Sequence, residues 1–318
     1  MQPEREYMSI SNEISVQVAG VGACVADTLY TLTGFPKEDT KLRAEDSKMA
    51  GGGPVATGLV AVSKLGVSTA YLGVLSEDAS GIFLKEDFEK YGVNTQAIVK
   101  YKEGYRSFSS SIWLNRTEGT RTCVFDRGNL PPYVLNEEGA AVLRQAKILM
   151  VDGNELQAAI DAATYIHAYG GKVLYDAGGR YEGVEKLLPQ ADILIPSAEF
   201  ALGITGETDI AQAAVKLYET YQPEVVVITD GKNGGVIYQG DTVEHYEAFK
   251  VDAVDSNGAG DVFHGAFAAA VVKGYSYREC CTFASAVSAV KCTGFGARES
   301  APDMAMLETF LRERGVTL

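Results

Sequence analysis

The sequence has little cysteine and little histidine. Its five cysteines are Cys24, Cys123, Cys280, Cys281 and Cys292, and its three histidines are His167, His245 and His264. The number of cysteines is odd and no two have the C-x-x-C spacing, which argues against a disulfide framework and a structural zinc site. The scattered histidines show no spacing typical of a Ser-His-Asp triad. We therefore expect reduced, mostly buried thiols in a cytoplasmic protein.

Positive charge and long apolar runs are also scarce. Lysine and arginine total 28 against 42 aspartates and glutamates, a formal net charge of −14, whereas proteins that bind nucleic acid normally carry an excess of positive charge. The longest apolar run, Ala266–Val272, is far shorter than the roughly 20 residues of a membrane-spanning helix. Residues Met1–Glu13 are polar and lack the apolar core of a signal peptide. We expect a soluble protein with no nucleic-acid or membrane partner.

Short apolar runs alternate with helical patterns along most of the chain. Strands are predicted at Ile14–Val21, Ser68–Val74, Lys147–Val151, Lys172–Tyr175, Ala191–Ile195 and Glu224–Thr229. Helices are predicted at Val55–Leu65, Leu156–Tyr169, Asp209–Tyr221, Ala259–Lys273, Tyr277–Cys292 and Met304–Arg314. Alternating strands and helices indicate an α/β fold with a parallel sheet covered by helices on both faces. Continuous apolar strands such as Val225–Ile228 favour burial on both faces.

Two segments interrupt this alternation, at about 30–49 and 104–127. The second reads as a strand from Arg106, a turn at Asn115–Thr120 and a returning strand, Arg121–Phe125. No linker or internal repeat divides the chain. We therefore expect a single domain over residues 1–318, with a small β layer that projects from the main sheet as a lid.

The sharpest motif is a glycine turn that opens a helix. The segment Tyr246–Val254 resembles a strand, and Gly258, Ala259 and Gly260 separate it from a helical pattern. The N-terminus of a helix has unpaired N–H groups and a positive potential. Glycine also lets the backbone approach a ligand closely. The turn is thus a natural site for phosphate.

Asp261 follows this turn, in the first turn of the helix. A carboxylate beside a phosphate site repels the phosphate, so it is better suited to face an alcohol and accept its proton. Phosphoryl transfer needs mainly positioning and electrostatic stabilisation beyond such a base. The structural alternative is an aspartate that only caps the helix after a glycine turn.

Two further glycine patterns are weaker. Gly51–Gly58 forms a turn before a helix that ends at Leu65-Gly66, a C-cap signal. This turn could present N–H groups to hydroxyls, or could only punctuate a loop. Gly20 and Gly22 resemble the start of a dinucleotide-binding fingerprint, but the third glycine is missing. A Walker A motif is absent.

These motifs together resemble the ribokinase-like carbohydrate kinases of the PfkB family. The second family signature, Asp-Thr-Thr-Gly-Ala-Gly-Asp, is matched by Asp255–Asp261, and the first by Gly52-Gly53 through Leu65-Gly66. The resemblance covers nearly the whole chain. It implies a parallel α/β sheet with a β lid over a sugar. It also implies transfer of the γ-phosphate of ATP, with Mg²⁺ and in some members K⁺, to a primary hydroxyl of a sugar.

The resemblance also implies roles for individual residues. It assigns Asp261 as the base, Gly258, Ala259 and Gly260 as the anion hole, and Asp27, Gly52 and Gly53 as sugar contacts. It places Thr229, Gly231 and Gly296 near the nucleotide, and Asp255, Asn257 and Ser300 at a monovalent cation. Turn and cap roles are the structural alternatives for the nucleotide and cation positions. A homodimer that pairs lid edges is a further expectation.

The sequence departs from the family pattern at two places. Thr57 stands where an asparagine is usual, and its hydroxyl offers fewer donors to a sugar. The family's Asn-x-x-Glu motif is replaced by Ser197-Ala-Glu199, which puts the magnesium contact of Glu199 in doubt. This pattern resembles ketose and sulfosugar kinases more than ribokinase itself.

Four arginines are candidates for an anionic substrate group: Arg106, Arg121, Arg127 and Arg180. Arginine binds such groups bidentately, so an arginine in the pocket would indicate an acidic, phosphorylated or sulfonated sugar. We select Arg127, which follows the lid, although solvated arginine is the structural alternative.

Three other functions remain open. A nucleoside kinase of the same fold could use Phe108, Trp113 and Phe125 as an aromatic wall. A non-catalytic sugar or nucleotide sensor and a dehydrogenase that uses Gly20 and Gly22 are the others. His264, three residues after Asp261, is interpreted as a packing residue.

Overall fold

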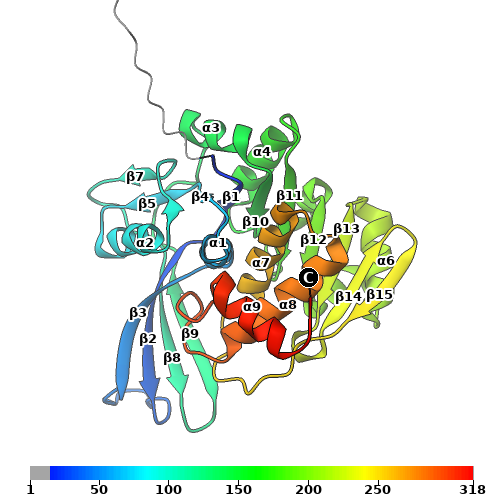
Figure 1. Ribbon diagram of the computed structural model, residues 1–318. Helices are drawn as coiled ribbons and strands as arrows, with labels where there is room; N and C mark the ends of the chain where they lie inside the picture. Colours follow the sequence, from blue (N-terminus) through cyan, green and yellow to red (C-terminus); the bar gives the residue numbers. More distant parts are fainter. Residues whose placement is uncertain (1–14, 318) are drawn as a thin grey trace, which may run out of the picture.

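A computed structural model describes residues 15–317, and its main element is a nine-stranded sheet (Figure 1). In spatial order the strands are β15 (Thr242–Tyr246), β14 (Gly235–Gln239), β13 (Val225–Thr229), β12 (Ile193–Pro196), β11 (Lys172–Ala177), β10 (Ile148–Val151), β1 (Val18–Val21), β4 (Thr69–Tyr71) and β6 (Val93–Asn94). All neighbours from β13 to β6 pair in parallel, whereas β14 and β15 form an antiparallel hairpin at one edge. The expected parallel sheet is therefore confirmed, with an antiparallel hairpin added.

Helices cover both faces of this sheet. One face carries buried side chains of α1 (Pro54–Lys64), α2 (Ala79–Lys90), α7 (Ala259–Lys273), α8 (Tyr277–Cys292) and α9 (Met304–Glu313). The other carries those of α3 (Glu137–Gln145), α4 (Leu156–His167), α5 (Ala198–Thr205) and α6 (Ile210–Tyr221). The two-sided cover explains why the parallel strands are apolar along their whole length. Within residues 15–317, no helix has the length and apolar character that crossing a membrane requires.

Most element boundaries agree with the sequence patterns, with two exceptions. Helices α7 and α8 have the predicted bounds, but the predicted strand Tyr246–Val254 is wrong, because β15 ends at Tyr246. Tyr246 pairs with Gly235, the first residue of β14, so no partner backbone remains for residues 247–254. The predicted strand Ser68–Val74 is divided between β4 and β5 (Val74–Ser76), which pairs with β7 (Val99–Tyr101). Residue 14 of the first predicted strand lies outside the described residues.

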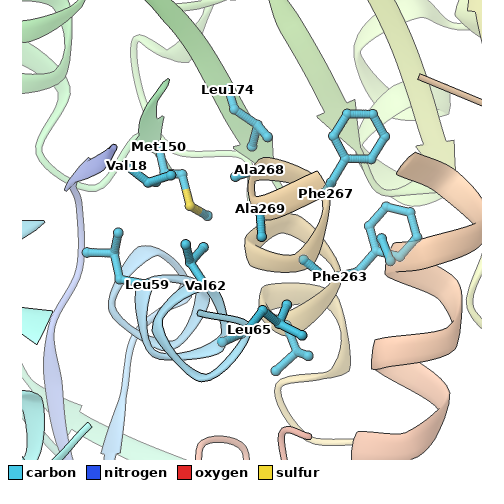
Figure 2. Close-up of a cluster of buried hydrophobic side chains, with 14 of the residues drawn as sticks. Val18, Leu59, Val62, Leu65, Met150, Leu174, Phe263, Phe267, Ala268 and Ala269 are labelled. Atoms are coloured by element: carbon cyan, nitrogen blue, oxygen red, sulfur yellow. The ribbon is translucent and has the colours of Figure 1, made fainter. Parts of the chain in front are cut away.

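Helices α1 and α7 cross at two glycines, and this contact fixes where α7 begins. A Cβ at Gly265 would lie 2.2 Å from the carbonyl oxygen of Gly58, so the two backbones are in direct contact there. Figure 2 shows the apolar side chains around this crossing, including Leu59 and Val62 of α1, Met150 of β10 and Phe263 of α7, which are all buried. The close approach holds the start of α7 at the edge where the parallel strands end.

A second, smaller sheet projects from this body (Figure 1). Its strand order is β3 (Asp46–Gly52), β2 (Val25–Leu32), β8 (Ser109–Asn115) and β9 (Thr120–Asp126). We call these four strands the small sheet. It contains the strands expected within 30–49 and 104–127, but β2 begins earlier, at Val25, and so includes Asp27. The outer strand β9 is exposed along its whole length.

Candidate active site

The glycine turn before α7 has the geometry of an anion site. Gly258 has φ +74°, a left-handed conformation that favours glycine, and the helix begins at the next residue without a side-chain cap. A Cβ on Gly258 would lie 2.4 Å from the Cβ of Ala297, whereas nothing lies within 4 Å of the position for a Cβ on Gly260. The first N–H groups of a helix lack acceptors within the helix. The N–H of Ala259 donates to the carbonyl of Ser256 at 3.2 Å, so the open side of the turn lies beside Gly260.

Asp261 lies in the first turn of α7 and remains partly accessible. Burial and, to a smaller extent, the charge of Asp176 raise the pKa of its carboxyl to about 7, while His264 opposes the shift. A base works best when its pKa is close to the working pH. Asp261 is therefore a carboxylate suited to take a proton at neutral pH.

His264 connects this turn to the sheet. Its Nδ1 lies 2.6 Å from the carbonyl oxygen of Gly260, and its Nε2 lies 2.9 Å from that of Ile195 in β12. The same Nδ1 lies 3.2 Å from Oδ2 of Asp176, and both side chains are buried. Burial lowers the pKa of His264, whereas the two carbonyls raise it. His264 is a packing residue, as interpreted, and it also holds the first turn of α7 against β12.

Asp27 and the glycine turn at Gly52 meet at the base of the small sheet. Ser110 donates a hydrogen bond to Oδ1 of Asp27 at 2.5 Å, and burial raises the pKa of this carboxyl. A Cβ on Gly52 would lie 2.0 Å from Oδ2 of Asp27, so only glycine fits beside the carboxylate. Gly53 has φ +93°, and a Cβ there would lie 2.2 Å from the carbonyl oxygen of Ala23. The turn before α1 therefore depends on both glycines.

Asp152 is a positioning residue that sequence reasoning missed. Its Oδ2 accepts hydrogen bonds from the backbone N–H groups of Ala23, at 2.9 Å, and Val55, at 3.3 Å. Its Oδ1 accepts one from the N–H of Asn154 at 2.9 Å. The buried carboxylate thereby joins the β1–β2 loop to the start of α1. Asp176, in the last part of β11, was also missed. The available signal for both was a carboxylate at the carboxyl end of a buried parallel strand.

Arg127 lines a cavity of about 370 Å³ between the small sheet and the main sheet. Its guanidinium lies 5.7 Å from the ring centre of Phe108, and its Nη2 donates to Oδ1 of Asn154 at 3.3 Å. Glu155 and Tyr71 also line the cavity. Asp27 and Asp261 are not among its lining residues.

The aromatic residues considered for a nucleoside base do not form one wall. Phe108 and Phe125 pack against each other at 5.9 Å, whereas Trp113 donates its indole N–H to Ser111. Gly20 and Gly22, considered for a dinucleotide, pack against side chains. A Cβ on Gly20 would meet Val55 at 2.6 Å. Close packing of β1 against α1 therefore explains Gly20 without a dinucleotide.

Thr57 lies in the first part of α1, where its backbone N–H donates to the carbonyl of Gly53. Its side chain is 1% exposed, and its hydroxyl has no hydrogen-bond partner within the described part of the chain. A buried hydroxyl without a partner is unusual and calls for an explanation.

The residues expected near the nucleotide are distributed over three loops. Thr229 ends β13 and pairs with Ser197, and Gly231 begins a short 3₁₀ turn with open space around its Cα. Gly296 lies in the loop after α8 and has φ +89°. Glu199 is exposed in the first turn of α5, directly after β12.

The expected cation ligands already bind protein donors. Oδ1 of Asp255 accepts from the N–H of Asn257 at 2.9 Å, and its Oδ2 accepts from the N–H of Gly296 at 3.0 Å. The side-chain oxygen of Asn257 accepts from Arg121, and the hydroxyl of Ser300 donates to the carbonyl of Gly296. Residues 15–317 contain no group of three or more His, Cys, Asp and Glu side chains that could hold a metal ion.

Comparison with known proteins agrees with this geometry. Residues 17–304 match the family model described as pfkB family carbohydrate kinase. A ribokinase of Arabidopsis thaliana is 27% identical over 89% of this chain and 78% of its own length. A 5-dehydro-2-deoxygluconokinase of Shouchella clausii is 25% identical over 88% of this chain and 91% of its own length.

The crystal structure of a putative ribokinase from Agrobacterium tumefaciens superposes with a TM-score of 0.86, covers 94% of this chain and 98% of its own, and is 27% identical. The structure of Arabidopsis thaliana ribokinase complexed with ribose and ATP superposes with a TM-score of 0.84, with coverages of 94% and 99% and 24% identity. The chain thus belongs to the pfkB family of carbohydrate kinases, as the two signatures indicated.

Proposed function

We propose that this protein transfers the γ-phosphate of ATP to a primary hydroxyl of a sugar, with Asp261 as the base. The observation that carries this proposal is the position of Asp261, one residue beyond the open amide turn of Gly260, with its pKa raised to about 7. The ionised carboxylate takes the hydroxyl proton while the sugar oxygen bonds to the γ-phosphorus and the bond to ADP breaks.

The amides of Gly258, Ala259 and Gly260 stabilise the charge on the transferring phosphoryl group. They are fixed before reaction by the left-handed Gly258 and by the bond of His264 to the Gly260 carbonyl. Donors that are already oriented need no reorganisation during the reaction, which is why such sites are effective.

The nucleotide lies, in this proposal, along the loops that hold Thr229, Gly231 and Gly296. Two solved relatives of this fold contain ATP, and one of them, a putative ribokinase II from E. coli, also contains Mg²⁺. Glu199 fits a magnesium contact because its exposed carboxylate follows β12, the strand that His264 ties to the Asp261 turn. Mg²⁺ keeps several waters and binds few carboxylates, and it supplies charge neutralisation to the phosphates. We do not extend the proposal to potassium, because its expected ligands bind protein donors.

The acceptor sugar binds, in this proposal, to Asp27, the turn of Gly52 and Gly53, and Thr57. Asp27 can accept hydrogen bonds from hydroxyls, as it does from Ser110. The hydroxyl of Thr57 is buried without a partner in the described part of the chain, so it contributes a donor to the sugar only if the start of α1 opens on binding. Arg127 at the cavity supports an acidic sugar, because a guanidinium binds a carboxylate bidentately. The name of the S. clausii relative, whose substrate is a sugar acid, also supports this class.

The small sheet acts as a lid in this single-domain kinase. Arg121 of β9 reaches the side chain of Asn257 beside the anion turn, so the small sheet already spans the site. Closure excludes water, which would otherwise compete with the sugar as acceptor. We place the enzyme in the cytoplasm, where ATP and sugars are available.

A coupled ADP-release screen over ketoses, aldoses, sugar acids and nucleosides tests the proposal. We expect activity with a ketose or sugar acid, and a loss of about 10²- to 10⁴-fold in kcat for Asp261→Asn, because a positioned base contributes about that much. The Asp261→Asn protein should still bind ATP.

The matched control is Asp161→Asn, an exposed aspartate on α4 that lies outside the site. Turnover of Asp261→Asn close to that of Asp161→Asn would remove Asp261 from the role of base. Activity with nucleosides alone would favour the nucleoside-kinase alternative. ATP binding without turnover on any acceptor would favour a sensor.

A further inference from the structure

Lys291 is a fully buried lysine beside the anion turn. It lies in the last turn of α8, and its side chain is 0% exposed. Its Nζ donates a 2.6 Å hydrogen bond to the backbone carbonyl of Asp255 and lies 3.7 Å from Oδ2 of the same residue. Lysine is almost never fully buried unless it is paired. The full burial of this ammonium is therefore unusual and needs a structural or functional explanation.

The carboxyl group of Asp255 lies near the ammonium of Lys291 and partly offsets the cost of burying its charge. Burial lowers the pKa of the ammonium, but the charges of Asp255 and Asp261 raise it. Removing one partner of a buried ion pair leaves an uncompensated charge, which is costly. Asp255 and Lys291 thus compensate each other in the interior.

The position of this charge matters because Asp255 begins the loop that carries the anion turn. The backbone N–H groups of Val254 and Asp255 donate to the carbonyl of Cys292, at 2.8 and 3.1 Å. Asp255 in turn accepts from Asn257, on the anion-turn side, and from Gly296, on the other loop. Lys291 therefore lies at the junction of the two loops between which a monovalent cation was expected.

The oxygens that a cation would need already accept hydrogen bonds from protein donors. The Asp255 carbonyl accepts from the ammonium, and both of its carboxylate oxygens accept from backbone N–H groups. An ammonium is a compact point charge with three donors, so it can replace a small monovalent cation in this environment. A potassium ion bound to the same carbonyl would lie beside the positive charge of the ammonium, which disfavours it.

We propose that the ammonium of Lys291 serves as a built-in monovalent cation that organises the anion turn, so that this kinase needs no added potassium. The proposal rests on the proposed kinase function and concerns the order of the loop from Asp255 to Asp261. Lys291 is a positioning residue in this proposal, because it acts through Asp255 and does not touch the reacting atoms.

The first test uses the wild-type protein. Melting temperature, binding of the ATP analogue AMP-PNP with Mg²⁺, and turnover are measured in about 0.1 M KCl and in tetramethylammonium chloride of the same ionic strength. We expect the three quantities to be the same in both salts. Activation or tighter AMP-PNP binding by potassium of about tenfold or more would overturn the proposal.

The second test replaces the cation. Lys291→Met should lose turnover and bind AMP-PNP about tenfold more weakly in tetramethylammonium chloride, and KCl or ammonium chloride should restore both. KCl should also raise the melting temperature of this variant relative to tetramethylammonium chloride. A folded Lys291→Met protein that potassium and ammonium do not restore would overturn the proposal, since the lysine would then have only a packing role. If the variant does not fold, the wild-type measurements decide.

The matched control is Lys64→Met. The ammonium of Lys64 donates to the carbonyls of Arg298 and Glu299, at 3.1 and 3.0 Å, in the loop after α8, but it has no bond to Asp255. Its variant can lose stability but should show no potassium dependence. If AMP-PNP does not bind to the wild type in any salt, both the kinase proposal and the built-in cation are refuted. If it binds but responds to potassium, only the built-in cation is refuted.

Discussion

The carboxyl groups around Asp261 explain why its pKa differs from that of an ordinary aspartate. Burial raises the pKa of Asp261, and the negative charges of Asp176 and Asp152 act in the same direction. Asp176 is itself buried, and burial raises its pKa as well. A cluster of carboxyl groups in a poorly solvated place shares protons, because like charges disfavour full ionisation.

This cluster predicts the pH dependence of the reaction. The value of kcat/KM should rise with pH through about 7, because only the ionised form of Asp261 accepts a proton. Asp176→Asn should move the midpoint to lower pH, since it removes a charge that raises the pKa of Asp261. A pH–rate profile of the two proteins measures the shift, with Asp161→Asn on the surface of α4 as control. An unchanged midpoint in Asp176→Asn would contradict the role of that charge.

The raised pKa of Asp261 also predicts an effect on stability. The folded protein binds a proton at Asp261 that the unfolded chain releases near pH 4, so the free energy of unfolding should fall as pH rises from about 4 to 7. Asp261→Asn removes this loss and should stabilise the protein at pH 8 by about 1–2 kcal/mol. A pKa shift of one unit corresponds to about 1.4 kcal/mol. We expect less than the full effect of the shift, because the side chain of Asp261 is only partly buried and solvent screens its charge. Urea unfolding at pH 5 and pH 8 measures the difference. Equal stability of the variant and the wild type at pH 8 would contradict the shift.

Gly53 is a position where the replacement of glycine should strongly reduce stability. Its φ of +93° would strain any other residue, and a Cβ would meet the backbone carbonyl of Ala23 at 2.2 Å. Gly66 has a similar φ of +79° but nothing within 4 Å. Gly66→Ala should cost about 1 kcal/mol for the left-handed backbone alone, and Gly53→Ala about 3 kcal/mol or more. Urea denaturation distinguishes them, and equal costs would show that the contact with Ala23 can relax.

At the scale of the elements, the crossing of α1 and α7 connects stability to the site. The carbonyl of Gly58 contacts Gly265 directly, and Asp261 lies one turn before Gly265 on the same helix. A larger residue at the crossing would displace the first turn of α7 together with the base. Small shifts of a catalytic group can lower the rate considerably.

Gly265→Ala should therefore destabilise the protein by about 3 kcal/mol and lower kcat as well. Gly58→Ala is the matched control at the same crossing. Its Cβ would first meet the flexible end of Met150, at 2.6 Å, and should cost about 1 kcal/mol. Thermal unfolding and turnover of both variants measure the contrast. A Gly265→Ala protein as stable and active as Gly58→Ala would show that the helices can separate freely.

The elements also show what local pattern can and cannot predict. The bounds of α7 and α8 follow from local signals in the sequence: glycines flank α7, and Ser276 and Glu279 form a capping box at the start of α8. Residues 247–254 have a strand-like pattern but no strand, because a strand needs a partner and Tyr246 already pairs with Gly235, the first residue of β14. Pairing is a property of the sheet, so the pattern of one segment does not decide it.

At the scale of the whole molecule, the small sheet has two edge strands, β3 and β9, and β9 is the more exposed of the two. All of β9 is exposed, and its Val124 and Phe125 are 58% and 61% exposed. Exposed edges of this kind favour pairing with another chain. We keep the prediction of a homodimer formed through the small sheet.

Val124→Lys tests this assembly, because a charge on the outer strand disfavours pairing. We expect the wild type to elute as a dimer in size-exclusion chromatography with light scattering, and the variant to shift toward the monomer. Val134→Lys is the control, since Val134 is 75% exposed but lies outside the small sheet. A wild-type monomer, or a dimer that both variants retain, would contradict the predicted interface.

The sequence by itself determined the family, the alternation of strands and helices and the glycine turn with Asp261, because each depends on residues close together in the chain. The tertiary structure alone decided which distant groups meet. Arg298, a buried residue near the C-terminus, binds Asp87 of α2 at 2.6 Å and the carbonyl of Gly52 at 2.7 Å. The ammonium of Lys291 likewise meets Asp255 only because α8 returns to the anion turn. Such contacts depend on how the elements pack, and no local spacing encodes that packing.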